Sequence, residues 1–196
     1  MKTSYKTLLA ATLTGTLLLT LTGCSSKSEP EAPEQGECVI AGVEGPDWAC
    51  GTYKDDKAFT ATGSAKISRL GHGFTRREAL AVARSNLAQQ IETDIKDKVE
   101  TFMRATGIAS SEVTDKVVNQ VSRQTARVTL ADSKQIAYWE NSGDESIYVL
   151  VSVGREQVNR SVKNGVVSSF RNEAALWQQF QAQNALDGLE KEFPTP

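Results

Sequence analysis

A stripe of apolar residues at helical spacing is the strongest constraint on the fold of this chain. Its members are Ala79, Ala83, Leu87, Ile91, Ile95, Val99 and Phe102. Spacings of three and four residues place all of them on one face of an α-helix. Thr75–Glu78 (TRRE) predicts a capping box at the start of this helix, and Gly107 predicts a left-handed cap at its end. At 1.5 Å per residue the helix would be about 45 Å long.

A second helix is predicted directly after the first. It begins at Ser110 or Ser111, and its apolar stripe contains Val113, Val117, Val121 and Val128, whereas Gln120, Arg123 and Gln124 lie outside that stripe. Because only a short turn around Gly107 separates the two helices, we expect them to form an antiparallel hairpin.

Two segments alternate at period two, the spacing of β-strands, and a third, Ile147–Val153, is nearly all apolar and predicts a central strand. Ala58–Ile67 places Phe59, Ala61, Gly63, Ala65 and Ile67 on one face, and the small residues on that face imply a close neighbour. The segments 135–140 and 147–153 flank the turn Asn141–Asp144 and predict a β-hairpin. The chain is therefore predicted to be α+β, with a small antiparallel sheet of about three strands packed by helices.

The tail after the last strand predicts an extra C-terminal helix. Its large apolar residues are Phe170, Trp177, Phe180, Leu186 and Leu189. This helix packs either on the protein's own sheet or on another subunit or envelope partner, and the sequence leaves both alternatives open. We expect a homo-oligomer or a complex with an envelope protein.

The first residues predict an export signal. Lys2 and Lys6 precede the apolar run Leu8–Leu21, which is too short for a membrane span and fits a secretory signal. An ordinary cleaved signal with an incidental cysteine is the plainer alternative. However, Leu21–Cys24 (LTGC) resembles the lipobox of bacterial lipoproteins. That resemblance implies cleavage after residue 23, a diacylglycerol on the Cys24 thiol and a fatty acyl chain, such as palmitate, on its new amine.

The residues after Cys24 imply where the protein is anchored. Ser25 and Ser26 stand where an aspartate would imply retention at the inner membrane, so the resemblance implies the outer membrane, with the folded domain in the periplasm. Ser25–Glu37 has no aliphatic or aromatic side chain beyond one alanine, so residues 24–37 are expected to be a lipidated cysteine followed by a disordered tether.

Cys38 and Cys50 enclose a short loop, and an exported chain meets an oxidising compartment, so a disulfide between them is expected. A two-cysteine metal site is the alternative, but further ligands are lacking. We therefore expect a signal peptide over residues 1–23, the lipidated tether over 24–37, an α+β domain with a disulfide loop over 38–153 and a helical extension over 154–196.

No catalytic, cofactor or metal constellation is evident in the sequence. The chain has a single histidine, His72, between two glycines, so a Ser-His-Asp triad would depend on it. The acidic residues Glu92, Asp94, Asp97 and Glu100 alternate with lysines and indicate a solvated helix face, with a weak divalent-cation site as the alternative. The net charge of −2 speaks against nucleic acid as a partner. We expect no enzyme, no small-molecule substrate and no cofactor other than the covalent lipid.

The order of these motifs resembles the Lpp-twenty lipoprotein family of Gram-negative envelopes. The matching pieces are Pro46–Trp48 (PDW), Thr62–Ala65 (TGSA), Arg77–Ile91 (REALAVARSNLAQQI), Ala137–Glu140 (AYWE) and Ile147–Val153 (IYVLVSV). The resemblance covers roughly residues 46–153. It implies an α+β domain and no known enzymatic activity. Some relatives, the FlgP-type flagellar lipoproteins, look like ring components around the flagellar base, but the Cys38–Cys50 loop and the tail from Gly165 depart from those shorter relatives.

These observations predict a non-enzymatic outer-membrane lipoprotein that acts by self-association or partner binding in the cell envelope. An accessory component of the flagellar outer-membrane ring is a narrower alternative. An activator of an envelope enzyme is a third, because a chain without its own catalytic residues could still activate another protein.

Overall fold

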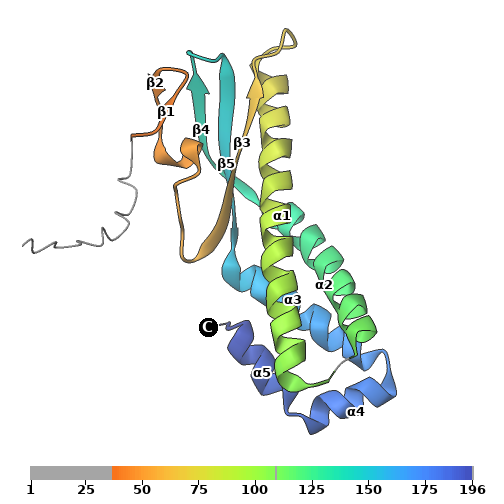
Figure 1. The fold of residues 1–196 in the computed structure, drawn as a ribbon. Helices are drawn as coiled ribbons and strands as arrows, with labels where there is room; N and C mark the ends of the chain where they lie inside the picture. Colours follow the sequence, from red (N-terminus) through yellow and green to blue (C-terminus); the bar gives the residue numbers. More distant parts are fainter. Residues whose placement is uncertain (1–36, 109, 196) are drawn as a thin grey trace, which may run out of the picture. The chain divides into compact units, whose positions relative to one another are not determined.

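Strand β5 (Ser146–Gly154) is the centre of a three-stranded antiparallel sheet, with β3 (Ala58–Lys66) on one side and β4 (Lys134–Asn141) on the other. The computed structural model describes residues 37–108 and 110–195 (Figure 1). The predicted α+β architecture and the predicted central position of β5 are confirmed.

The hairpin of β4 and β5 aligns its aromatic residues across the two strands. Trp139 is directly opposite Tyr148, and their ring centroids are 5.2 Å apart. An irregularity between Gln135 and Ala137 leaves Ile136 without a partner on β5. The register places alternate residues of β5 on the two faces of the sheet, so that each face needs its own cover.

Helix α1 (His72–Thr106) covers one face of the sheet. It has 35 residues, which corresponds to about 52 Å. Every residue of its predicted apolar stripe is buried. The first half contacts β3 and β5, and the second half extends past the sheet to the other helices (Figure 1). The predicted long helix is confirmed.

The predicted capping box is wrong. The helix begins at His72, with Gly71 as the N-cap residue, so Thr75 already lies inside the first turn. The Thr75 hydroxyl accepts a hydrogen bond from the N–H of Ser68 at 2.9 Å and donates one to the carbonyl of Gly71 at 3.3 Å. Thr75 therefore holds the loop before the helix in place.

Helix α2 (Ser111–Asp132) runs back along the second half of α1, after a turn in which Gly107 has a φ of 63° (Figure 1). This confirms the predicted hairpin of helices and the left-handed cap. Val117 and Val121 are buried in the same core as the stripe of α1.

The tail forms three helices where one was predicted: α3 (Arg155–Arg171), α4 (Ala174–Ala182) and α5 (Ala185–Glu192). The chain turns between α4 and α5 at Asn184, whose φ is 50°. Helix α3 packs on α2, and α5 packs on α1. The tail therefore belongs to the same compact unit as the sheet.

The segment before β3 covers the other face of the sheet. It contains the short strands β1 (Val39–Ile40) and β2 (Val43–Glu44) and the 3-10 helix η1 (Asp47–Cys50). The Thr62 hydroxyl of β3 donates a hydrogen bond to the Trp48 carbonyl at 2.5 Å. The sheet is therefore covered on both faces, by this segment and by α1.

Candidate functional site

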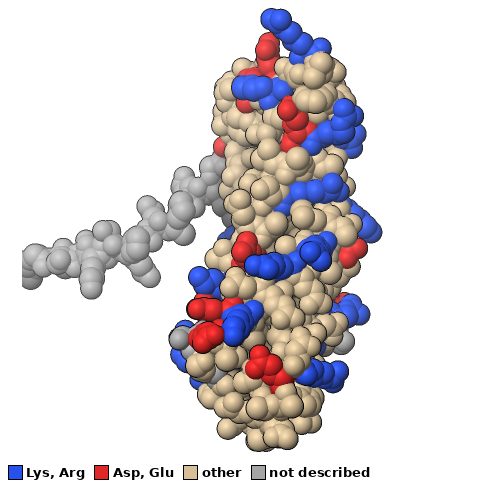
Figure 2. Space-filling model, turned by 90° about the vertical axis from the view of Figure 1, so that its right-hand side faces the viewer, with Lys and Arg blue, Asp and Glu red and all other residues tan. Residues whose placement is uncertain are grey.

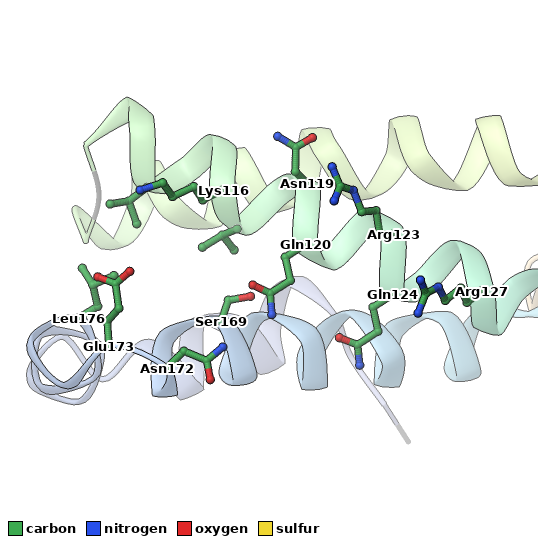
Figure 3. Close-up of a pocket in the computed structure, with 12 residues that line it drawn as sticks. Lys116, Asn119, Gln120, Arg123, Gln124, Arg127, Ser169, Asn172, Glu173 and Leu176 are labelled. Carbon is green, nitrogen blue, oxygen red and sulfur yellow. The ribbon is translucent and has the colours of Figure 1, made fainter.

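A groove lies between α2 on one side and the end of α3 and the start of α4 on the other (Figure 3). Its volume is about 800 Å³. The lining residues are Val113, Lys116, Val117, Asn119, Gln120, Arg123, Gln124 and Arg127 from α2, and Ser169, Asn172, Glu173 and Leu176 from the opposite wall. A groove of this size can hold a peptide segment or a ligand of comparable volume.

Basic residues follow the outer side of the α2 wall. At 100° per residue, Lys116, Arg123 and Arg127 lie within about 40° of one another around the helix axis. Along that axis the steps between them are about 10.5 Å and about 6 Å. All three side chains are exposed. Figure 2 shows Lys and Arg spread along the side of the molecule that carries α2, with acidic side chains between them.

Amide side chains form a second row, closer to α3. Gln120 and Gln124 point from α2 toward α3, and Ser169 and Asn172 lie on the opposite wall (Figure 3). Each amide offers two N–H donors and a carbonyl acceptor. The groove therefore combines positive charge at its rim with uncharged hydrogen-bonding groups inside.

The three basic side chains of the groove differ in whether they form ion pairs. Lys116 forms an ion pair with Glu112 at 3.0 Å. The hydrogen bond and the charge of Glu112, with a smaller effect of Glu173, raise the pKa of Lys116, and Lys116 in turn lowers the pKa of Glu112. Among the described residues, neither Arg123 nor Arg127 takes part in an ion pair. Each of these two guanidinium groups can donate N–H hydrogen bonds to a carboxylate.

The close contact of α2 and α3 forms the floor beside this groove. A Cβ on Gly165 would lie 3.3 Å from a methyl group of Val121 and 3.3 Å from the Gln124 side-chain oxygen. A glycine at this point of α3 lets the two helices approach and leaves room for Gln124 at the edge of their interface.

The predicted lipidation site, Cys24, lies outside the described residues. Cys38 and Cys50 are joined by a disulfide, as predicted, with their Cα atoms 5.7 Å apart. Gly45, inside the loop that this bond closes, lies against the ring of Trp139. The disulfide therefore holds the segment that covers the second face of the sheet.

The sequence leaves open whether the five large apolar residues of the tail pack on the chain itself or on a partner, and three of them pack on the chain itself. Phe170, Phe180 and Leu189 are buried in the chain's own core. The ring of Phe180 is 4.8 Å from that of Phe170 and 6.3 Å from that of Phe102 on α1. The physical reason is that the second half of α1 extends past the sheet, and the tail covers it. Trp177 is partly buried and stacks on Phe180, and Leu186 is exposed.

The polar residues that the sequence singles out lie apart from the groove. His72 is exposed, and its Nδ1 atom lies 3.4 Å from a carboxylate oxygen of Glu140. Asp94 forms an ion pair with Lys98 at 3.2 Å. Within residues 37–108 and 110–195, no three His, Cys, Asp or Glu side chains group as a metal site would. No helix in the same part of the chain is both long and apolar enough to cross a membrane.

The groove itself could not be predicted from the sequence. The helical stripe of α2 places Arg123 and Gln124 on an outer face, which is correct, but it does not show that α3 and α4 lie opposite. The only available signal is the spacing of Lys116, Arg123 and Arg127, which repeats on one face of the helix.

The comparisons with known proteins agree with this architecture. No curated protein matches the chain. The family model of the LPP20 lipoprotein matches residues 46–154, from the residue before η1 to the end of β5. The matched region includes the sheet, α1 and the α2 wall of the groove, and α3 and α4 lie beyond it. The match spans more than half of the sequence and confirms the resemblance drawn from the motifs: the chain belongs to the LPP20 lipoprotein family.

Proposed function

We propose that this protein is an outer-membrane lipoprotein, anchored by lipid on Cys24, whose folded unit binds copies of itself or an envelope partner and carries out no catalysis. Membership of the LPP20 lipoprotein family supports an envelope lipoprotein. The lipobox-like Leu21–Cys24 and the serines that follow it support the lipid anchor and the outer membrane.

The groove between α2 and α3–α4 is the observation that favours a binding role. It combines exposed guanidinium groups without ion-pair partners, inward-pointing amides and the apolar side chains of Val113 and Leu176. Recognition surfaces in proteins combine polar groups that fix orientation with apolar area that contributes affinity. The groove therefore has the composition of a binding surface.

The anchor is tested by replacing the lipid-accepting thiol. Cys24→Ala should remove the protein from the outer-membrane fraction, because the chain then has no acyl group to hold it there. Cys38→Ser is the control, since it breaks the disulfide with Cys50 but leaves the lipobox intact, and it should leave the protein membrane-bound. A Cys24→Ala protein that stays in the outer-membrane fraction would refute the anchor.

Binding at the groove is tested by photo-crosslinking in cells. A photoreactive residue in place of Gln120 should give adducts with a second copy or an envelope protein. The same residue in place of Lys96, on the exposed face of α1, is the control and should give none. The test uses the full chain, because Val166, Phe170 and Phe180 are buried and removing the tail would open the core. No adduct at Gln120 would argue against the groove as the binding surface.

A further inference from the structure

We propose that the groove binds the acidic segment Glu29–Glu37 of a neighbouring copy of the chain. This inference rests on the self-association included in the proposed function and names the surface and the occupant. The segment reads EPEAPEQGE and has four glutamates and no basic residue. The groove lining has three basic residues and a single acidic one, Glu173. The charges of the segment and the groove are therefore complementary.

The spacing of the charges also agrees. In an extended peptide of about 3.3 Å per residue, Glu29 and Glu31 are about 6.6 Å apart and Glu31 and Glu34 about 10 Å. The corresponding steps along α2 are about 6 Å from Arg127 to Arg123 and about 10.5 Å from Arg123 to Lys116. Because side chains alternate along an extended chain, Glu29 and Glu31 lie on one side and Glu34 on the other. Two carboxylates therefore align with the two arginines, Glu29 with Arg127 and Glu31 with Arg123, and Glu34 lies at the level of Lys116, which is already paired with Glu112.

The row of amides suits the backbone of such a segment. Pro30 and Pro33 have no backbone N–H and favour an extended conformation, so the segment presents mainly carbonyl acceptors. The amides of Gln120 and Gln124 point toward α3 (Figure 3), and their NH₂ groups can donate to those carbonyls. The basic residues of the groove would then bind the glutamate side chains of the segment, and the amides would bind its backbone carbonyls.

The length of the chain requires that the segment come from another copy. Asn141, at the end of β4, donates a hydrogen bond to the Ile40 carbonyl at 3.0 Å, so Ile40 lies at that end of the sheet. Lys116 lies beyond the far end of β4, because α2 extends away from the sheet there (Figure 1). Lys116 is about 24 Å along α2 from its end at Asp132, and β4 adds about 23 Å in the direction of Asn141, so the two residues are separated by more than about 30 Å. Six residues join Glu34 to Ile40 and reach at most about 21 Å. Glu34 therefore cannot reach Lys116 of its own chain.

Such a contact joins two different surfaces, so each copy can bind one neighbour through its segment and another through its groove. Exposed ion pairs are individually weak and are screened by salt. Lipid anchors that hold many copies on one membrane raise their effective concentration, which compensates for weak pairwise contacts. We therefore expect a weak interaction in solution that depends on ionic strength.

The test uses a fluorescent synthetic peptide of residues 25–37. The acceptor is the complete mature chain with Cys24→Ser and with Glu29, Glu31 and Glu34 changed to Gln, which frees its groove. Fluorescence anisotropy should show binding at about 50 mM salt that weakens severalfold at about 300 mM. A peptide with the same three glutamates changed to Gln should bind at least about tenfold more weakly, since it loses three of its four negative charges and both pairs with the arginines.

Charge reversal in the groove gives the decisive comparison. Arg123→Glu with Arg127→Glu should abolish binding of the natural peptide and allow binding of a peptide with Glu29→Lys and Glu31→Lys. The control, Lys96→Glu with Arg104→Glu on exposed positions of α1, makes the same change of net charge and should leave binding unchanged. Equal binding by the groove variant and the control would overturn the inference, and so would equally tight binding of poly-glutamate, which lacks the segment's spacing and prolines.

Sedimentation of the Cys24→Ser chain separates this inference from the proposed function. If both the Glu→Gln and the Arg→Glu variants lose self-association, the groove and the segment form the contact. If the chain self-associates equally well in both variants, the inference is wrong but self-association stands. If the natural chain stays monomeric at every concentration and the peptide does not bind, both the inference and self-association are refuted.

Discussion

Gly63 sets the distance between α1 and the sheet. A Cβ at this position would lie 2.5 Å from the carbonyl oxygen of Ala79 and 2.7 Å from the Cα of Ala83, so the helix backbone rests directly on the strand. The sequence predicts a close neighbour here because Gly63 lies between Ala61 and Ala65 on one face. The sequence could not identify α1 as that neighbour, because small residues on a strand indicate a close contact but not which element makes it.

Gly63→Ala should therefore destabilise the protein by at least about 2 kcal/mol, because the added methyl group would collide with backbone atoms that cannot move independently of the helix. Equilibrium unfolding in urea measures the loss. Gly73→Ala is the control, since a Cβ there meets nothing within 4 Å, and it should change the free energy of unfolding by less than about 1 kcal/mol. Equal stability of the two variants would contradict the close packing of α1 on β3.

Asp144, in the turn between β4 and β5, makes stability depend on pH. Burial by itself would raise the pKa of Asp144, but hydrogen bonding with Ser146 and Tyr148 and the charge of Lys66 outweigh it and hold the pKa below its ordinary value. The Tyr148 hydroxyl is 3.1 Å from Asp144 Oδ2, and Lys66 Nζ is 3.6 Å from the same atom. The folded state therefore binds the proton of this group less readily than the unfolded chain does.

Because of this lower pKa, Asp144 stabilises the folded state more at neutral pH than in acid. The stabilisation by Asp144 is complete above about pH 4, the ordinary range of an aspartate, and is lost as the pH falls through the lower pKa of the folded state. Asp144→Asn should reduce the loss of melting temperature between about pH 5 and pH 2. Tyr148→Phe keeps the ring against Trp139 and removes one hydrogen bond, so it should reduce that loss in part. Unchanged acid profiles in both variants would refute this role of Asp144.

At the scale of elements, periodicity predicts single helices and strands well and their neighbours poorly. The long stripe of α1, the turn at Gly107 and the apolar run 147–153 each correspond to a feature of the structure. The start of α1 was misplaced because Thr75 uses its hydroxyl to bind Ser68 and Gly71, although TRRE fits a capping box. The division of the tail into α3, α4 and α5 depends on contacts with α1 and α2, which no local pattern contains.

Substitutions at two residues of the tail test whether each side chain belongs to the core or to the exposed surface. Phe180→Ala should lower the free energy of unfolding by about 3 kcal/mol or more, because it leaves a cavity among Phe102, Phe170 and Trp177. Leu186→Ala, at a side chain that is 53% exposed, should stay within about 0.5 kcal/mol. Thermal unfolding of both variants checks this. A stable Phe180→Ala protein would indicate that the tail packs elsewhere.

At the scale of the whole molecule, the sequence predicts the fold class, the disulfide and the family, while the candidate site requires the structure. The fold class, the disulfide and the family can be predicted because they depend on short motifs or on the order of motifs along the chain. The groove depends on α2 facing α3 and α4, and its two walls are separated in sequence by the β4–β5 hairpin. Arg123 and Arg127 are ordinary exposed residues in the sequence, and only the opposite wall makes them part of a binding surface.

The buried residues of α1 also determine how the sheet at one end of this helix is rotated, about the helix axis, relative to the helices at its other end. From Ala79 to Val99 they repeat every four residues, and each step turns about 40° beyond a full helical turn, so the buried edge winds by about 200°. One inserted residue in the middle of α1 would rotate one end against the other by about 100°, whereas seven inserted residues, close to two full turns, would nearly preserve the phase. The length of α1 can therefore change during evolution only in steps of about two turns if the sheet and the groove are to keep their relative orientation.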